Sequence, residues 1–544
     1  MDKIKQDMTL PPDLLSQSGT GPIRRMHPIY QDSLPPCNHA CPAGENIQAW
    51  LALAQEGRYE EAWQSLIANN PMPAVHGRVC YHPCENACNR AQVDQSVSIH
   101  AVERFLGDQA LQNHWKPEFT ASASGKRVLV IGAGPSGLSC AWHLRRLGHE
   151  VEIYEAGPMA GGMMRFGIPA YRMPRDILDG EIQQIIQTGI KLKLNQKVED
   201  VVKAQQEGHF DAVFMAIGAH LAKKAYIPAR EAGKILDAVS YLAAVERGEA
   251  PKLGRRVAIY GGGNTAMDAA RTARRLGAEE AMIIYRRDRE HMPAHQFEAD
   301  EALEEGVKIN WLRTIRDIDN TTLTVEEMEI DAEGRPQPTG RFETLESDSL
   351  ILALGQDVDI SVLERIPGIK LQKEGVVVVD EHMMTSVAGI FAGGDMVPSE
   401  RTVTIATGHG KKAAHHIDGW LRNIPYHKPE PIPVMEYPGL HLWYNTQAGV
   451  VHQPVVTPEA REGFDEIIGG LDAKQARYEA TRCYSCGNCF ECDGCYGACP
   501  ETAVIKLGKG LRYHFDYDKC TGCAACYHQC PCHAIEMVEE GVQS

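Results

Sequence analysis

Two kinds of apolar spacing divide the chain. Between residues 45 and 110, apolar residues recur every three or four positions, as in ENIQAWLALAQEGRYEEAWQSLIANN, which predicts helices. Residues 125–425 instead alternate short Val/Ile-rich runs with amphipathic stretches, which is typical of βαβ units around a parallel sheet. The Pro-rich segment 424–438 indicates a linker. We therefore expect an α/β protein with a separate helical region before the sheets.

A glycine-rich turn follows the first Val/Ile-rich run, in KRVLVIGAGPSGLSCAWHLRRLGHEVEIYEA. Gly132 permits a tight turn, Gly134 lets the backbone approach a pyrophosphate, and Gly137 allows close packing of helix on strand. The positive end of the helix then faces the phosphates. Glu155 closes the next strand, where a carboxylate can accept from a ribose hydroxyl. This turn predicts a dinucleotide site.

A second turn of the same kind occurs in RRVAIYGGGNTAMDAARTARRLGAEEAMIIYRRDRE. Its predicted cofactor-binding residues are Gly261, Gly263, Asn264 and Ala266. The following strand ends in Arg286 and Arg287 rather than in an acid, and an arginine there can pair with the 2′-phosphate of NADP(H). NAD(H) is the alternative, because Asp288 follows directly.

Two further motifs assign the two nucleotide sites. GGMMR, with Gly162 and Arg165, follows the first βαβ unit, and IFAGGDMV places Gly394 and Asp395 after a strand. Both resemble flavin-contact motifs of flavoproteins with two dinucleotide-binding folds, in which the Asp binds a ribityl hydroxyl. FAD is therefore expected at the first site and the nicotinamide nucleotide at the second, in a domain inserted within the FAD domain.

Sixteen of the 17 cysteines lie near the two ends of the chain. Cys140, the remaining one, has no nearby cysteine in sequence, and thiol–disulfide chemistry beside a flavin needs a CxxC-type pair. We interpret Cys140 as a core residue, which argues against a role like that of thioredoxin reductase.

The C-terminal cysteines follow the two-cluster ferredoxin pattern, C-x2-C-x2-C-x3-C-P, twice. The last cysteine of each motif ligates the cluster of the other motif. One [4Fe–4S] cluster is thus expected on Cys489, Cys492, Cys495 and Cys530. The other is expected on Cys520, Cys523, Cys526 and Cys499. Zinc is the alternative for such thiols, and the roles of Cys483, Cys486 and Cys532 stay open.

The N-terminal cysteines lie in PPCNHACPAG and GRVCYHPCENAC. They are Cys37, Cys41, Cys80, Cys84 and Cys88. Five thiols suffice for one all-cysteine four-iron cluster but not for two, and a structural zinc site is again the alternative.

Residues 30–425 resemble the small, NADPH-oxidising subunit of bacterial glutamate synthase and related flavin domains. The matching stretches include CPAGENIQAWL, VSIHAVERF, GGMMRFGIPAYRMP, GGGNTAMDAA and YRRDREHMPA. Fused members, such as the iron–sulfur flavoprotein of dissimilatory sulfite reductase systems, carry a similar ferredoxin module. The resemblance implies an N-terminal cluster on Cys41, Cys80, Cys84 and Glu103. The family's second N-terminal cluster uses two cysteines upstream of Cys37, and the residues there are YQDSLPP, so one N-terminal cluster is expected.

Charge and hydropathy restrict the partners. The formal net charge of -17 disfavours nucleic acid and anionic lipid, and no apolar run reaches the length of a spanning helix. The first 17 residues lack the apolar region of a secretory signal, so we expect a cytoplasmic protein with reduced thiols and no membrane insertion.

These features together predict an NAD(P)H:acceptor oxidoreductase that exchanges electrons with a ferredoxin or a redox enzyme subunit, as a homodimer or a hetero-oligomer. Hydride transfer needs no acid–base catalyst, so no catalytic residue is assigned. The alternatives are a non-catalytic relay or redox-sensing scaffold, and a glutamate synthase small subunit. The expected segments are a helical iron–sulfur domain (1–120), an FAD domain (125–240 and 375–425), an NAD(P)H domain (241–374), a linker (426–480) and an α+β ferredoxin-like domain (481–544).

Overall fold

The computed structural model describes residues 24–223, 234–372, 375–443 and 445–541. The segment considered for a secretory signal lies outside these residues. Within them, no helix combines the length and the apolar character needed to cross a membrane.

The first nucleotide fold is a five-stranded parallel sheet with helices on its faces. Its strand order is β16-β5-β2-β3-β4. The strands are β2 (Arg127–Ile131), β3 (Glu150–Tyr154), β4 (Lys191–Lys193), β5 (Ala212–Met215) and β16 (Ile390–Ala392). The helices are α7 (Pro135–Arg146), α8 (Met163–Phe166), α9 (Arg175–Ile186), α10 (Val201–Glu207) and α14 (Val403–Arg422). The central strands read as continuous apolar runs because helices such as α7 and α14 bury them.

The second nucleotide fold is inserted between β5 and β16. Its parallel sheet has the order β10-β9-β8-β14-β7. The strands are β7 (Lys234–Asp237), β8 (Arg256–Tyr260), β9 (Glu280–Tyr285), β10 (Lys308–Trp311) and β14 (Ser349–Leu352). The helices are α11 (Ala238–Glu246), α12 (Asn264–Arg275) and α13 (Gln296–Glu304). An antiparallel sheet of β11 (Arg313–Asp319), β12 (Thr322–Ile330) and β13 (Pro336–Glu346) packs against this parallel sheet through a shared apolar core.

The chain crosses between the two folds at a short antiparallel pair, β6 (Leu221–Ala222) and β15 (Gln356–Asp357). The stretches AIGA (216–219) and ALGQ (353–356) lie at these crossovers. The predicted fold class, with one Rossmann-like domain inserted in the other, is confirmed.

Short helices form the N-terminal domain. They are α1 (Pro36–Ala40), α2 (Ile47–Gln55), α3 (Tyr59–Ile67), α4 (Pro73–Val79), α5 (Pro83–Asn86), the 3-10 helix η1 (Asn89–Gln92) and α6 (Ile99–Gln112). Residues 426–480, the expected linker, contain η3 (Tyr437–Gly439), η4 (Pro458–Ala460) and the start of α15 (Ala473–Thr481). Ala476 and Ala480 of α15 lie in the same core as Trp50 and Leu106, so this helix completes the N-terminal domain.

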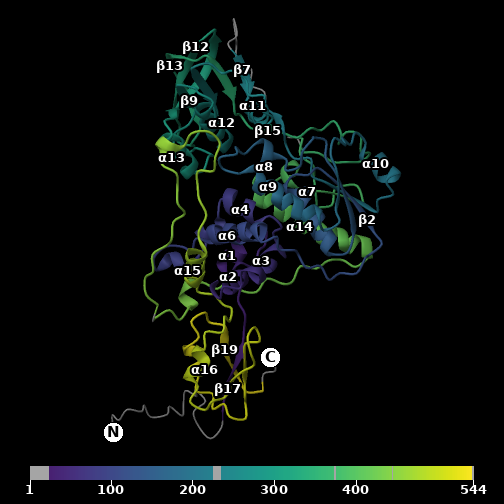
Figure 1. Cartoon of the computed structure of the whole chain (residues 1–544), viewed down its shortest axis with the longest axis vertical. Helices are drawn as coiled ribbons and strands as arrows, with labels where there is room; N and C mark the ends of the chain where they lie inside the picture. Colours follow the sequence, from purple (N-terminus) through teal and green to yellow (C-terminus); the bar gives the residue numbers. More distant parts are fainter. Residues whose placement is uncertain (1–23, 224–233, 373–374, 444, 542–544) are drawn as a thin grey trace.

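The C-terminal module is a small α+β unit. It consists of α16 (Gly494–Ala498), β17 (Val504–Lys506), β18 (Tyr513–Phe515), α17 (Ala525–His528) and β19 (Ile535–Glu539). Strand β1 (Met26–Tyr30) leaves the helical domain and pairs antiparallel with β19, so residues from both ends of the chain form one ribbon. Figure 1 shows this module at one end of the long axis, the inserted fold at the other, and the helical domain between them.

Candidate active site and thiol sites

A cavity of about 880 Å³ lies where the two nucleotide folds and the helical domain meet. The first fold contributes Gly134, Glu155 and Asp395, the second contributes Asn264, and the helical domain contributes Tyr81. The cavity is therefore shared by the first glycine turn and by Asn264, which directly follows Gly263 in the second.

The backbone of the first turn requires glycine at two positions and leaves a third open. Gly132 has a φ of +106°, and a Cβ there would lie 2.3 Å from the Ala216 carbonyl oxygen. A Cβ on Gly137 would lie 2.0 Å from the Gly132 carbonyl oxygen. A Cβ on Gly134 would meet only Gly162 Cα, at 3.9 Å.

Polar groups at this turn fit a pyrophosphate. Gly134 precedes α7, whose first N–H groups have no partner within the helix. The Ser136 hydroxyl, in the first turn of α7, is buried without a hydrogen-bond partner and lines the cavity. Sequence reasoning did not single out Ser136, although its place after Gly134-Pro135 was a usable signal.

Glu155 stands at the tip of β3 with its carboxylate held in place. The Ala133 N–H donates to its Oε2 at 2.8 Å, and the Gly157 N–H donates to its Oε1 at 2.7 Å. The carboxylate is therefore fixed at the edge of the cavity, where a ribose hydroxyl could reach it.

Gly394 and Asp395, in the 3-10 helix η2 (Gly394–Met396), also line the cavity. Gly394 has a φ of +73°, and its N–H donates to His409 Nδ1 at 3.2 Å. Burial raises the pKa of Asp395 to about 6. A hydroxyl that donates to this carboxylate would reduce the cost of burying its charge.

Gly162 and Arg165 differ in position. Gly162 lines the cavity beside Gly134. Arg165 is buried away from it, where its Nε donates to the Ala160 carbonyl at 2.7 Å and its guanidinium pairs with Asp179. The predicted flavin contact of Arg165 therefore has no counterpart among the residues that line the cavity.

The second turn repeats the geometry of the first. A Cβ on Gly261, at a φ of +150°, would lie 2.2 Å from the Ala353 carbonyl oxygen, whereas Gly263 faces open space. Ala266 is buried in the core of this fold. Asn264 begins α12 and donates from Nδ2 to the hydroxyl of Tyr81 at 2.5 Å. This bond links the nucleotide turn to the helical domain.

The two arginines after β9 lie at the surface of the inserted fold. Arg286 is exposed, and no ion pair of its guanidinium is present in the described part of the chain. Arg287 Nε is buried and unpartnered. Asp288 instead accepts from the His291 backbone N–H at 3.0 Å, and its Oδ1 lies 2.7 Å from His291 Nδ1. Asp288, the residue that left NAD(H) as an alternative, is thus already engaged by His291, whereas Arg286 has no acidic partner in the described structure.

The cysteines of the C-terminal module gather around two enclosed cavities. The first is lined by Cys489, Cys492, Cys495 and Cys530, with Cys532 beside them. The second is lined by Cys499, Cys520, Cys523 and Cys526. The structure thus brings together the same sets of four that the ferredoxin spacing suggests. Soft thiolates in fours suit an iron–sulfur cluster.

In the helical domain, Cys41, Cys80, Cys84 and Glu103 lie together. Burial raises the pKa of Cys84 well above its usual value, and the nearby Cys41, Cys80 and Glu103 add to this effect. Cys80 lies between Val79 and Tyr81, which both line the large cavity. The site therefore lies one residue along the chain from the cavity wall.

Two buried carboxyl groups, those of Glu103 and Glu45, lie close together at this site. Glu103 is buried, and Asn70 Nδ2 donates to its Oε1 at 2.9 Å. The same amide nitrogen donates to Glu45 at 3.0 Å. Burial raises the pKa of Glu103 well above its usual value, and Glu45 adds to the shift. A cation at Glu103 would offset this cost, and Glu45 was not foreseen as its neighbour.

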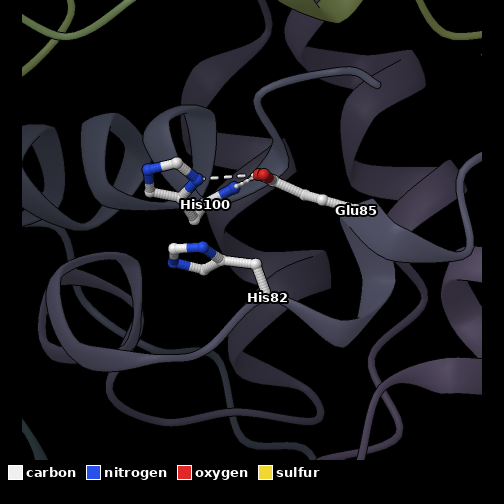
Figure 2. Close-up of side chains that lie close together, drawn as sticks. All are labelled: His82, Glu85 and His100. Carbon is white, nitrogen blue, oxygen red and sulfur yellow. Dashed lines mark hydrogen bonds and ion pairs between the residues drawn. The ribbon is translucent and has the colours of Figure 1, made fainter. Parts of the chain in front are cut away.

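His82, Glu85 and His100 form a second polar group on the same helices, shown in Figure 2. The rings of His82 and His100 stack with centroids 3.8 Å apart. Glu85 Oε1 lies 2.7 Å from His100 Nδ1, and Gln453 Oε1 lies 2.8 Å from His100 Nε2. Both nitrogens of His100 are engaged and the rings face each other, so their lone pairs do not converge on a metal. The Glu85–His100 contact instead joins α5, which carries Cys84, to α6, which carries Glu103.

Cys140 is fully buried in the core of the first fold. Among the described residues that line the large cavity, none is a cysteine. The cavity therefore lacks the thiol pair that disulfide chemistry beside a flavin requires.

Family models and relatives agree with this architecture. The model described as pyridine nucleotide-disulphide oxidoreductase matches residues 92–207 and 126–410. The model of dihydropyrimidine dehydrogenase domain II, 4Fe-4S cluster, matches 30–115, and a 4Fe-4S binding domain matches 513–536.

Three relatives are informative. The NADP(+)-dependent formate dehydrogenase subunit beta of Moorella thermoacetica is 36% identical over 83% of this chain and 70% of its own. The NADPH-Fe(3+) oxidoreductase subunit beta of Geobacter sulfurreducens is 33% identical over 85% and 76%. The small chain of the Azospirillum brasilense glutamate synthase [NADPH] is 33% identical over 72% and 87%.

Two nucleotide folds around one cavity, flanked by thiol-rich modules, define an NAD(P)H-dependent flavoprotein oxidoreductase with iron–sulfur domains. The chain belongs to the pyridine nucleotide-disulphide oxidoreductase family, in the group that includes the glutamate synthase small chain.

Proposed function

We propose that this protein exchanges a hydride with NADP(H) and single electrons with a protein partner, using FAD and [4Fe–4S] clusters. The observation that carries the proposal is the position of Cys80, between two residues that line the cavity shared by both glycine turns. A thiol site whose ligand is flanked by residues of the cavity wall is close enough for electron transfer between them.

The chain's own residues fit FAD at the first turn. Gly134 leaves room for a pyrophosphate, the Ser136 hydroxyl and the start of α7 offer donors, and Glu155 and Asp395 offer acceptors for hydroxyl groups. When bound, the flavin supplies the conversion between a two-electron hydride and single electrons. The protein's part is to position and shield, so we assign no acid–base catalyst.

The second turn favours NADP(H) over NAD(H). Arg286 has no acidic partner in the described structure, whereas Asp288 is held by His291. A guanidinium at this place can form charge-assisted hydrogen bonds with a 2′-phosphate. The names of the Moorella, Geobacter and Azospirillum relatives all refer to NADP(H), which supports the same choice.

The thiol sites support at least three clusters. One uses Cys41, Cys80, Cys84 and Glu103 in the helical domain. The other two occupy the two four-cysteine cavities of the C-terminal module. Thiolate ligands of this kind suit the reducing cytoplasm, where we place the protein.

The partner is a ferredoxin or a subunit of a larger redox enzyme. The relatives named as beta subunits or small chains support this, since each name denotes part of an assembly. The net charge of -17 favours a partner with a basic docking surface.

An anaerobic titration tests the proposal. The purified protein, with flavin and iron quantified, is titrated with NADPH and separately with NADH while flavin and cluster absorbance are followed. We expect NADPH to bleach both chromophores at a lower concentration than NADH. Bleaching by NADH alone would contradict the choice of nucleotide. If neither nucleotide reduces fully loaded protein, the chain is a relay or scaffold and the proposal fails.

A further inference from the structure

A third enclosed cavity lined by cysteines lies between the helical domain and the C-terminal module. Cys37 on α1 and Cys88 at the start of η1 form one side, and Cys483 and Cys486 form the other. Apart from Cys140 and Cys532, these are the cysteines that the three sites above do not use. Two come from the N-terminal block and two from the C-terminal block, separated by the whole length of both nucleotide folds.

This cavity resembles the two in the C-terminal module. It is similar to them in size and is likewise enclosed. Each of the three is lined by at least four cysteines, and the remaining wall is largely apolar; here Leu51, Val97 and Ile99 contribute. Burial raises the pKa of Cys37, and the nearby Cys483, Cys88 and Cys486 raise it further, so the four sulfurs are close neighbours.

Hydrogen bonds already point at these sulfurs. The Ser485 N–H donates to Cys483 Sγ at 3.4 Å, and Asn89 Nδ2 donates to Cys486 Sγ at 3.4 Å. The first bond repeats the one at the site in the helical domain, where the His82 N–H donates to Cys80 Sγ at 3.4 Å. Donors aimed at ligand sulfurs favour the thiolate and tune the metal centre.

The two sides of the cavity are fastened together by other contacts. Gln48 Nε2 donates to Ser485 Oγ at 2.5 Å, and the Ser33 N–H donates to the Gly487 carbonyl at 3.0 Å. Arg482 is buried and pairs with Glu479 at 2.9 Å and with Asp94 at 3.2 Å. The position of Cys483 and Cys486 against the helical domain is therefore built into the fold.

We propose that Cys37, Cys88, Cys483 and Cys486 bind a fourth [4Fe–4S] cluster, with ligands from both ends of the chain. The cluster fastens the C-terminal module to the helical domain. Four cysteines also suit a structural zinc ion, but the surroundings favour the redox-active centre. Cys37 lies four residues before Cys41, Cys88 lies four residues after Cys84, and Cys486 lies three residues before Cys489. The site thus lies between two other thiol sites. A redox-inactive metal there could not pass electrons from one to the other.

The metal content of the full-length protein, isolated without oxygen, tests the proposal. With all four sites filled, we expect about 16 iron atoms per chain, four per cluster, and no zinc. A value near 12 iron atoms in protein whose other clusters are complete by spectroscopy would overturn the proposal. So would about 12 iron atoms with one zinc ion.

Two variants on opposite ends of the chain test the shared ligation. Cys37→Ser and Cys486→Ser should each lose about four iron atoms and the same electron paramagnetic resonance signal of the reduced protein. Cys140→Ala, which removes a buried cysteine that lines none of the three cysteine-lined cavities, should keep all the iron and this signal. Loss of the signal in Cys37→Ser but not in Cys486→Ser would refute a cluster held from both ends.

Controls separate misfolding and failure of the proposed function from failure of this inference. Retained FAD and the remaining iron show that a variant has folded, and the iron content of the unaltered protein decides the question if a variant does not fold. None of these measurements depends on NADPH. Protein with about 16 iron atoms that NADPH does not reduce would contradict the proposed function and leave the fourth cluster standing.

Discussion

Replacing Gly134 with alanine is expected to weaken FAD binding without disturbing the fold, whereas the same replacement at Gly132 should destabilise the fold itself. Gly134 has a φ of -80°, which any residue adopts, and its Cβ would point into the cavity. Gly132 has a φ of +106°, and its Cβ would collide with the Ala216 carbonyl oxygen. The two glycines are two residues apart, so they form a matched pair.

The magnitudes follow from these geometries. At Gly132, the left-handed backbone costs an alanine about 1–2 kcal/mol and the overpacking about 1–3 kcal/mol more. Together these lower the melting temperature by about 5 °C or more in a domain of this size. At Gly134, alanine reduces the entropy of the unfolded chain and is neutral or slightly stabilising. Its methyl group occupies the place of the pyrophosphate, so FAD should bind about 10–100-fold more weakly.

The assay measures FAD affinity and the melting temperature of the apoprotein for both variants. For Gly134→Ala we expect an unchanged melting temperature and reduced affinity. For Gly132→Ala we expect a lower melting temperature in the absence of any cofactor. Full FAD affinity in Gly134→Ala would show that the pyrophosphate does not pass this residue, and would refute the assignment of the first turn.

Three further predictions concern the nucleotide cavity. Arg286→Ala should lower kcat/KM for NADPH about 10–100-fold, because the charge-assisted hydrogen bond to the 2′-phosphate is lost, and should leave kcat/KM for NADH unchanged. The control is Arg289→Ala, which removes a nearby arginine that pairs with Asp300. An equal loss with both nucleotides would show that Arg286 does not contact the 2′-phosphate. Burial raises the pKa of Asp395 from 3.8 to about 6, so the apoprotein loses stability as the pH rises through this window. The Asp395→Asn apoprotein should therefore have a higher melting temperature than the unaltered apoprotein at pH 8 but not at pH 3. Equal melting temperatures at pH 8 would contradict the raised pKa of Asp395. The same variant should bind FAD about 10-fold more weakly. Cys140→Ala should reduce dye acceptors with NADPH at an unchanged rate. A large decrease in this rate would instead indicate that thiol–disulfide chemistry takes part.

The sequence predicts the nucleotide folds well because their determinants are local. A strand, a glycine turn and a helix within 30 residues specify a βαβ unit, and the structure places Gly132 and Gly261 at equivalent corners of two sheets. The inserted arrangement also follows from the order of motifs along the chain. The antiparallel sheet of β11–β13 was not foreseen, since alternation of apolar residues on exposed strands is weak there.

Contacts between distant segments account for what the sequence could not provide. Tyr81 reaches Asn264 only because the helical domain packs against the inserted fold. Arg165 fits a flavin-contact motif by its place in the chain, but the fold turns it toward Asp179. Cys483 and Cys486 continue a ferredoxin-like spacing, so counting along the chain assigns them to that module. Their partners Cys37 and Cys88 are visible only in three dimensions.

The thiol sites follow one another in an order that the local chain enforces. Cys37 lies in α1, and Cys41 directly follows the end of that helix. Cys84 lies in α5, and Cys88 lies two residues past its end, directly before η1. In both cases a ligand of one site and a ligand of the next are only four residues apart along the chain. Four residues correspond to about one helical turn, which rises about 5.4 Å. The short chain segment between the two ligands therefore keeps neighbouring sites close together. Cys80 is flanked by two residues of the cavity wall, and the ferredoxin-like module lies at one end of the molecule (Figure 1). This spacing therefore arranges the thiol sites as a series between the two.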